Sequence, residues 1–149
     1  MNLLIRSDCG HSDPLNRLIA DIAKAINGEY QAVGYYKALA RLAPTEKERE
    51  SIREIRRDEI KHYKQFLKIY QKLTGHRPMV TEGSRPQNYR QGLEFSIEDE
   101  LKTVDFYLDI SDRAFDSHVR RIFRRAALDE QQHAGTFNYF LTKLCCNDP

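Results

Sequence analysis

The sequence contains little cysteine and no long apolar run. Its three cysteines, Cys9, Cys145 and Cys146, lie near the two ends of the chain. An odd, scattered set argues against a disulfide framework and favours a reducing compartment, and it assigns these thiols no role. The first residues lack an apolar stretch of signal-peptide length, and no window approaches the roughly 18 apolar residues of a membrane span. We therefore expect a cytoplasmic protein with no membrane partner.

An excess of charge of one sign is also missing. The formal net charge is +2 at pH 7, which is too small to favour nucleic acid as a partner. Of the 149 residues, 31% are charged and 40% are hydrophobic. Such a chain is long enough to bury one sizeable core without disulfides. The composition is typical of a single helical domain.

Four stretches have the apolar periodicity of amphipathic helices, and almost nothing has that of a strand. We expect helices over residues 14–42, 45–75, 92–115 and 118–144. The segment between the second and third helices is rich in glycine, proline and polar residues, so it is expected to be a loop. It is longer than a turn between adjacent antiparallel helices needs, and it suits a crossover between opposite ends of a bundle.

The predicted architecture is therefore all-α, a four-helix bundle over residues 14–144 with a long crossover between helices 2 and 3. Its two halves are expected to be related by a pseudo-twofold axis. Residues 1–13 are expected to form a mobile N-terminal segment, and residues 145–149 a C-terminal tail.

Each predicted helix has an inward face of residues spaced three and four apart. These faces are expected to run from Leu15 to Ala40, Ile52 to Leu73, Leu93 to Ala114 and Val119 to Leu144. Near its middle, every face carries one carboxylate: Glu29, Glu59, Glu100 and Glu130. On the second and fourth helices a histidine follows three residues later, giving Glu-x-x-His twice. Three residues advance a helix by about 300°, so both side chains of a motif face one side and can chelate one ion.

An internal repeat strengthens this pattern. An offset of 71 residues maps Glu29 onto Glu100, Glu59 onto Glu130 and His62 onto His133. A single Glu-x-x-His in a charged helical protein is a weak signal. Two such motifs, each preceded at the same distance by a glutamate on an apolar face, are a strong one.

The alternative to a metal site is structural. A lone glutamate on such a face usually reaches solvent at the rim, and a lone histidine is usually a hydrogen-bonded core group. Four ionised carboxylates in one core layer without a counter-charge would be very costly. Two divalent cations balance that charge. The pattern therefore predicts a dinuclear metal site with six ligands: Glu29, Glu59, His62, Glu100, Glu130 and His133.

A known ligand pattern matches this arrangement. The order Glu, Glu-x-x-His, Glu, Glu-x-x-His over four helices resembles that of the ferritin-like di-iron carboxylate superfamily. Within it, the chain is most similar to the rubrerythrin-like group. The resemblance implies a ferritin-like bundle in which Glu59 and Glu130 bridge two metal ions. The remaining ligands would complete the two coordination spheres, Glu29 with His62 and Glu100 with His133.

The resemblance also implies partners for the two histidines. Asp129 would orient His62 and Asp58 would orient His133 through hydrogen bonds across the bundle. The alternative for both aspartates is plain surface exposure.

Two tyrosines lie two turns beyond ligand glutamates on the same faces, Tyr36 after Glu29 and Tyr107 after Glu100. They would either donate hydrogen bonds to the ligand carboxylates or serve only as core aromatics. The sequence leaves both alternatives open.

The chain departs from the rubrerythrin-like group in two respects. It has no rubredoxin-type Cys-x-x-Cys pair, so the group's built-in electron donor is missing. Ile97 stands where those proteins carry an additional ligand glutamate. The remaining six-ligand set is closer to that of bacterioferritin.

The function expected from this resemblance is redox catalysis at two metal ions. Oxygen-rich ligation favours iron first and manganese second, and the centre would reduce O2 or H2O2 by two electrons. An external electron donor, which the sequence does not identify, and a homodimer are the expected partners. The alternatives are iron storage, a non-catalytic metal-binding assembly component, and hydroxylation of an organic substrate. The last requires an apolar pocket beside the metals, against which the bulky aromatics Tyr36, Phe66, Tyr107 and Phe137 argue.

Overall fold

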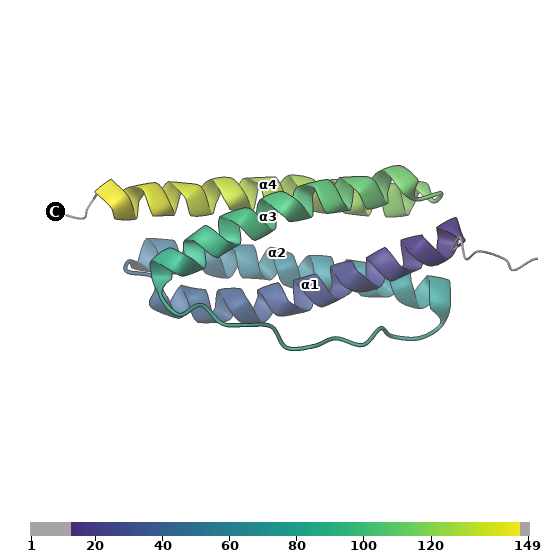
Figure 1. Cartoon of the computed structure of the whole chain (residues 1–149), viewed down its shortest axis with the longest axis horizontal. Helices are drawn as coiled ribbons and strands as arrows, with labels where there is room; N and C mark the ends of the chain where they lie inside the picture. The colour runs from purple at the N-terminus through teal and green to yellow at the C-terminus, as the bar shows by residue number, and fades with distance from the viewer. Residues whose placement is uncertain (1–12, 147–149) are drawn as a thin grey trace, which may run out of the picture.

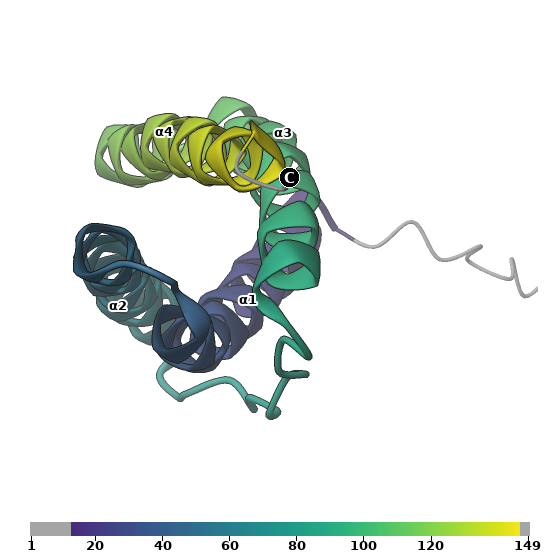
Figure 2. The ribbon, with the colours of Figure 1, turned by 90° about the vertical axis from the view of Figure 1, so that its left-hand side faces the viewer.

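The computed structural model describes residues 13–146, and within this range it contains four long helices and no strand. The helices are α1 Pro14–Leu42, α2 Glu46–Thr74, α3 Tyr89–Arg113 and α4 Ser117–Cys146. They lie lengthwise beside one another (Figure 1), and the end-on view shows them around a common core in the order α1, α2, α4, α3 (Figure 2). The predicted all-α four-helix bundle is confirmed.

Local sequence signals set the ends of the first two helices. Pro14 is the first residue of α1, and Ala43, which precedes a proline, adopts an extended conformation that ends it. The Thr45 side chain accepts a hydrogen bond from the backbone N–H of Glu48 at 3.2 Å and so caps α2. The helix ends at Gly75, whose φ of 79° is the left-handed conformation that favours glycine.

Two predicted boundaries are wrong by a few residues. The third helix begins at Tyr89 rather than near residue 92, because the Asn88 side chain accepts a hydrogen bond from the Gln91 backbone N–H at 3.0 Å. The fourth helix continues through Cys146, two residues beyond the expected boundary at 144, and both terminal cysteines are exposed. The expected mobility of residues 1–12, and the position of Cys9, lie outside the described residues.

The connection between α2 and α3 runs along α1 for the length of the bundle (Figure 1). It is held there by polar contacts: Tyr30 Oη donates to Glu82 at 2.8 Å, and the Thr81 backbone N–H donates to Asn27 Oδ1 at 2.8 Å. This connection is the predicted crossover. It makes α1–α2 and α3–α4 two separate hairpins, and the helices pack mainly within these hairpins.

The buried core consists of two apolar clusters separated along the bundle axis. One contains Ile22, Phe66 and Phe123, and the other contains Leu39 and Phe137, together with their neighbours. The polar layer described below lies between them. None of the four helices combines the length and apolar content that crossing a lipid bilayer requires.

The prediction that Leu15 and Leu73 belong to the inward faces is wrong. Leu15 and Leu73 are 42% and 43% exposed, because they lie in the first turn of α1 and the last turn of α2, at one end of the bundle. Phe123, which was not assigned to the face of α4, is fully buried and stacks on Phe66 with 4.1 Å between ring centroids.

Candidate metal centre

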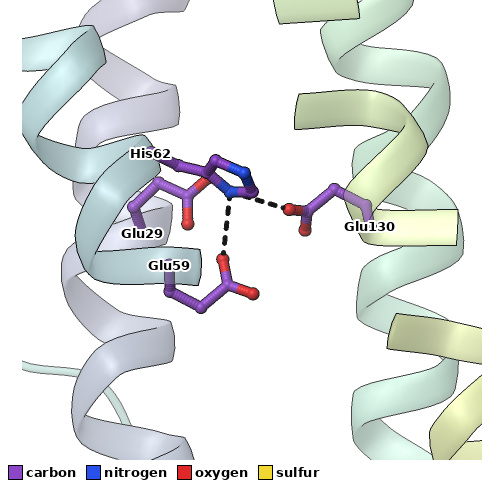
Figure 3. A group of neighbouring side chains, drawn as sticks. All are labelled: Glu29, Glu59, His62 and Glu130. Carbon is purple, nitrogen blue, oxygen red and sulfur yellow. Dashed lines mark ion pairs between the residues drawn. The ribbon is translucent and has the colours of Figure 1, made fainter. Parts of the chain in front are cut away.

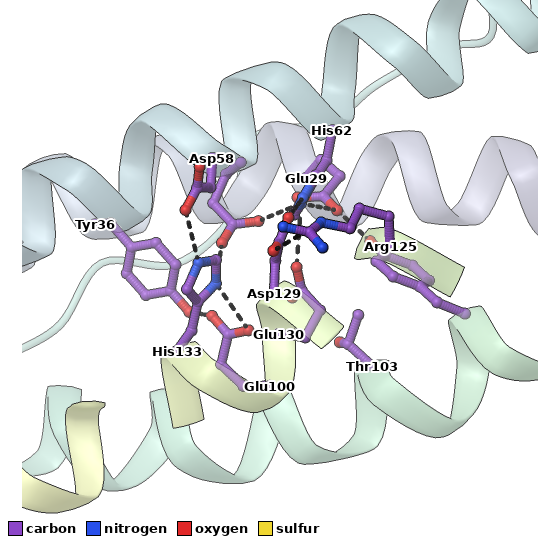
Figure 4. Close-up of polar contacts among 12 residues, drawn as sticks. Glu29, Tyr36, Asp58, His62, Glu100, Thr103, Arg125, Asp129, Glu130 and His133 are labelled. Atoms are coloured by element: carbon purple, nitrogen blue, oxygen red, sulfur yellow. Dashed lines mark hydrogen bonds and ion pairs between the residues drawn. The ribbon is translucent and has the colours of Figure 1, made fainter. Parts of the chain in front are cut away.

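All six predicted ligand side chains lie in the layer between the two apolar clusters. None is more than 3% exposed. Each helix contributes one carboxylate, and α2 and α4 each add a histidine one turn further along (Figure 4). The periodicity that places apolar residues on the inward faces thus also directs these polar side chains to a common point.

The six side chains form two overlapping groups. In each group, one oxygen or nitrogen atom per residue lies within 4.8 Å of the corresponding atom of every other member. The groups are Glu29, Glu59, His62 and Glu130, and Glu59, Glu100, Glu130 and His133. Glu59 and Glu130 belong to both, the two positions that the family resemblance assigns to bridging ligands.

His62 has one ring nitrogen toward the centre and one away from it. Its Nδ1 lies 3.1 Å from Glu130 Oε1, 3.5 Å from Glu29 Oε1 and 3.6 Å from Glu59 Oε2 (Figure 3). Its Nε2 lies 3.1 Å from Asp129 Oδ2. Asp129 accepts the Nε2 proton, and Nδ1 faces the carboxylates, so its lone pair would be available to a metal ion once Nδ1 loses its own proton.

His133 repeats this arrangement in the second half of the chain. Its Nδ1 lies 2.9 Å from Glu59 Oε1 and 3.6 Å from Glu100 Oε2, and its Nε2 lies 3.1 Å from Asp58 Oδ2 (Figure 4). The two aspartates differ in environment, since the Asp129 side chain is 16% exposed and that of Asp58 is 45% exposed. Asp58 therefore contacts its histidine from the surface of the bundle.

Two tyrosines contact carboxylates of the centre across the α1–α3 boundary. Tyr36 on α1 donates a hydrogen bond to Glu100 on α3, and Tyr107 on α3 donates one to Glu29 on α1. Burial, followed by the nearby carboxylates, raises the pKa of both hydroxyls, so they keep their protons and act as donors. They are therefore more than core aromatics.

The carboxylates differ in their affinity for protons. Burial and then repulsion by neighbouring carboxylates raise the pKa of Glu59 and Glu130 well above the ordinary value. Burial also acts to raise the pKa of Glu29, but contacts with Glu59, His62 and Tyr107 outweigh it and lower that pKa.

Both histidines bind protons more tightly than usual. Burial acts to lower the pKa of each ring, but the surrounding carboxylates, led by Asp129 for His62 and Glu100 for His133, outweigh it. The pKa of His133 rises to about 9, and that of His62 rises as well. In the metal-free protein, protons on the histidines, Glu59 and Glu130 therefore offset part of the negative charge.

Among the described residues, five buried polar atoms of the centre make no hydrogen bond of acceptable geometry, although other centre atoms lie close to them. They are Glu59 Oε1, His62 Nδ1, Glu100 Oε2, Glu130 Oε1 and His133 Nδ1. Leaving such atoms unsatisfied is costly, and no lysine or arginine is buried within residues 13–146. Metal ions would satisfy all five atoms. A set of carboxylate oxygens with one imidazole in each group suits iron or manganese better than structural zinc.

Sequence reasoning missed a cavity beside these residues. It has a volume of about 210 Å³, lies between α1 and α3, and reaches all four carboxylates of the centre. The one available signal was the spacing of the small residues Ala25, Gly28 and Ala32 on one side of α1.

The chain matches known proteins over most of its length. The sequence model of the rubrerythrin family matches residues 22–92 and 91–147. The uncharacterized protein YhjR of Bacillus subtilis (strain 168) is 42% identical over 130 residues, covering 87% of this chain and 88% of that protein.

Two solved structures have the same fold. One is a bacterioferritin of Desulfovibrio desulfuricans, described as having a diiron site, with a TM-score of 0.79, 20% identity and coverage of 91% of this chain and 84% of that one. The other is nigerythrin, with a TM-score of 0.71, 20% identity and coverage of 99% and 74%. At this identity the likeness establishes the fold alone.

Proposed function

Because the chain belongs to the rubrerythrin family, we propose that its bundle binds two iron ions, or two manganese ions, and reduces O2 or H2O2 by two electrons. The observation that carries the proposal is the pair of overlapping carboxylate–histidine groups, whose inward atoms lack partners. Iron is preferred because the bacterioferritin of similar fold is described as having a diiron site.

In the proposed centre the six side chains divide between the ions. Glu29 and His62 would hold one ion, Glu100 and His133 would hold the other, and Glu59 and Glu130, which belong to both groups, would be shared between them. Glutamate suits this task because its carboxylate can shift between bridging and chelating modes as the charge on the metals changes.

When bound, two such ions would supply two electrons by changing between the +2 and +3 states, and with two protons these would convert H2O2 to two water molecules. The protein's own side chains hold the ligands in place. Asp58 and Asp129 contact the outer nitrogens of the two rings, and the two tyrosines fix Glu29 and Glu100. We expect the electrons to be returned by an external donor.

Anaerobic loading with Fe(II) tests the proposal. We expect two ions per chain and a rapid ferric absorbance change when H2O2 is added in stoichiometric amount. Two bound ions without any reaction toward H2O2 or O2 would contradict the enzymatic proposal and leave a metal-binding role.

The oligomeric state is part of the same proposal. We expect a homodimer, measured by size-exclusion chromatography with light scattering. A hollow shell of many subunits that accumulates iron would instead support storage.

A further inference from the structure

The cavity between α1 and α3 has an inner end formed by ligand side chains. Glu29, Glu59, Glu100 and Glu130 all line it, whereas neither histidine does. The histidines and their aspartates approach the centre from α2 and α4. A molecule in the cavity would therefore meet the metals on the side of the carboxylates and of the two tyrosines that bond to them.

The walls of the cavity include small and aromatic residues, and two polar residues of α3, Asp99 and Thr103. On α1, Ala25, Gly28 and Ala32 recur at spacings of three and four, and on α3 the facing wall contains Phe95 and Phe106. The small side chains on α1 create the space, and the rings on α3 give it an apolar surface. A Cβ atom built on Gly28 would meet no other atom within 4 Å.

The mouth of the cavity is polar and is bordered by the crossover. Gly83 and Ser84 line it together with Gln31 and Lys24. The loop lies so close to α1 here that a Cβ atom on Gly83 would be 3.0 Å from the Gln31 side chain. Polar groups thus occur beside the crossover and at the carboxylate end, and apolar side chains of α1 and α3 form part of the remaining lining.

This cavity is larger than O2 or H2O2 requires. A water molecule occupies roughly 30 Å³ in the liquid, and an engineered apolar cavity of about 150 Å³ binds benzene. The volume here is about 210 Å³. Of the aromatics that counted against an organic substrate in the sequence, Phe66 and Phe137 do not line it, whereas the two tyrosines do. Apolar walls favour a molecule that carries hydrocarbon, since H2O2 gains nothing from them.

We propose that the cavity binds organic hydroperoxides with a compact alkyl or aryl group, and that these are substrates of the centre. This inference rests on the proposed function. The apolar group would lie between α1 and α3 with the O–O bond toward the carboxylates. The O–O bond breaks, the two metals each lose one electron, and two protons from solvent complete an alcohol and a water molecule.

A binding experiment tests the cavity without turnover. Zn²⁺ has no redox chemistry, so the zinc-loaded protein is titrated with benzene while backbone amide NMR shifts are followed. Shifts are expected at residues of the cavity walls. Gly28→Leu should narrow the cavity and weaken binding by about tenfold or more. Gly135→Leu is the matched control, because it adds the same side chain to a helical glycine that lies on α4 and does not line the cavity. As at Gly28, a Cβ atom at this position would meet no other atom within 4 Å. Unchanged binding in Gly28→Leu would overturn the inference.

Turnover by the iron-loaded protein distinguishes the inference from the proposed function. With tert-butyl hydroperoxide and H2O2 as substrates, Gly28→Leu should lower kcat/KM about tenfold or more for the organic peroxide only. Gly135→Leu should change neither. Reduction of H2O2 without reduction of tert-butyl hydroperoxide, or an equal loss for both in Gly28→Leu, would overturn the inference and leave the proposed function intact. No turnover of either peroxide would overturn the proposed function itself.

Discussion

Asp129 Oδ2 lies 3.1 Å from Nε2 of His62, on the opposite side of the ring from the carboxylates of the centre. His133 and Asp58 repeat the contact at the same distance. In each pair the aspartate and the histidine come from different hairpins. The aspartate directly precedes the predicted ligand glutamate of its own hairpin's Glu-x-x-His motif. The same turn of helix therefore carries one predicted ligand, the glutamate, and an aspartate that orients a histidine on the opposite hairpin.

The two aspartates should control metal affinity to different extents. We expect Asp129→Asn to weaken metal binding about 10- to 100-fold, because it removes the charge that holds the His62 ring. Asp58→Asn should have a smaller effect, since the Asp58 side chain is 45% exposed and solvent weakens its contact. Competition with a chelator measures both constants. The exposed Asp105 on α3 provides the control, Asp105→Asn, and equal constants for all three variants would contradict this role.

The shared carboxylates should be indispensable for the second ion. Glu59→Gln keeps the shape of a side chain found in both groups but removes its charge, so fewer than two ions per chain are expected by metal analysis. The metal-free variant should be at least as stable as the parent at neutral pH, because glutamine replaces a buried acid whose ionisation destabilises the fold.

Glu48→Gln is the matched control for that experiment. Glu48 is another buried carboxylate of α2, but its hydrogen bond comes from the Thr45 hydroxyl at 2.5 Å at the start of the helix. Its replacement should leave the binding of two ions unchanged. Two ions bound to Glu59→Gln would count against the bridging role.

The tyrosine hydroxyls should stabilise the centre measurably. Tyr36→Phe and Tyr107→Phe each leave a buried carboxylate without its donor, which is expected to lower the free energy of unfolding by about 1–3 kcal/mol. Denaturant titration of the metal-loaded protein measures the loss. Tyr139→Phe, at a position 57% exposed, should have little effect. If all three substitutions behaved alike, the two buried tyrosines would be acting as core aromatics only.

Metal affinity should rise with pH. The pKa values of Glu59, Glu130 and His62 are raised, and that of His133 lies at about 9. Metal ions must displace protons from these groups, so binding tightens and proton release falls as the solution approaches those pKa values. Calorimetric titration with Mn²⁺ in buffers of different ionisation enthalpy measures both quantities. Affinity independent of pH between 6.5 and about 9 would contradict the shifts.

The stability of the metal-free protein should show the opposite trend. The pKa of His133 is raised from 6.5 to about 9 on folding, so its stabilising contribution is complete below pH 6.5 and is lost as the pH rises through about 9. Glu59 and Glu130, whose pKa values are also raised, destabilise the fold as they ionise. Tm of the metal-free protein should therefore fall across this range, whereas the metal-loaded protein should change much less.

Much of the fold was predictable because each helix repeats the same signal. Apolar spacing gives the four inward faces, and caps such as Thr45 and Gly75 give the ends of α2. The exposure of Leu15 and Leu73 was not predictable. Periodicity identifies the inward face of a helix, but it does not show whether another helix covers the first and last turns of that face. The start of α3 depended on one side-chain cap at Asn88.

The site was predictable for a related reason. The spacing of Glu59 and His62 fixes their direction on one helix, and the 71-residue repeat supplies the facing half. Contacts between helices were harder, because spacing alone does not reveal that Tyr36 bonds to the carboxylate of α3. The cavity also escaped prediction, because it depends on the distance between α1 and α3.

The shared glutamates have a mechanical consequence for the two hairpins. The α1–α2 hairpin lends Glu59 to the group built around His133, and the α3–α4 hairpin lends Glu130 to the group built around His62. Pulling the hairpins apart would therefore strip a ligand from both ions at once. Binding of metal ions would therefore join the two hairpins, which otherwise pack only weakly against each other. Their separation would then require the loss of both metal sites together.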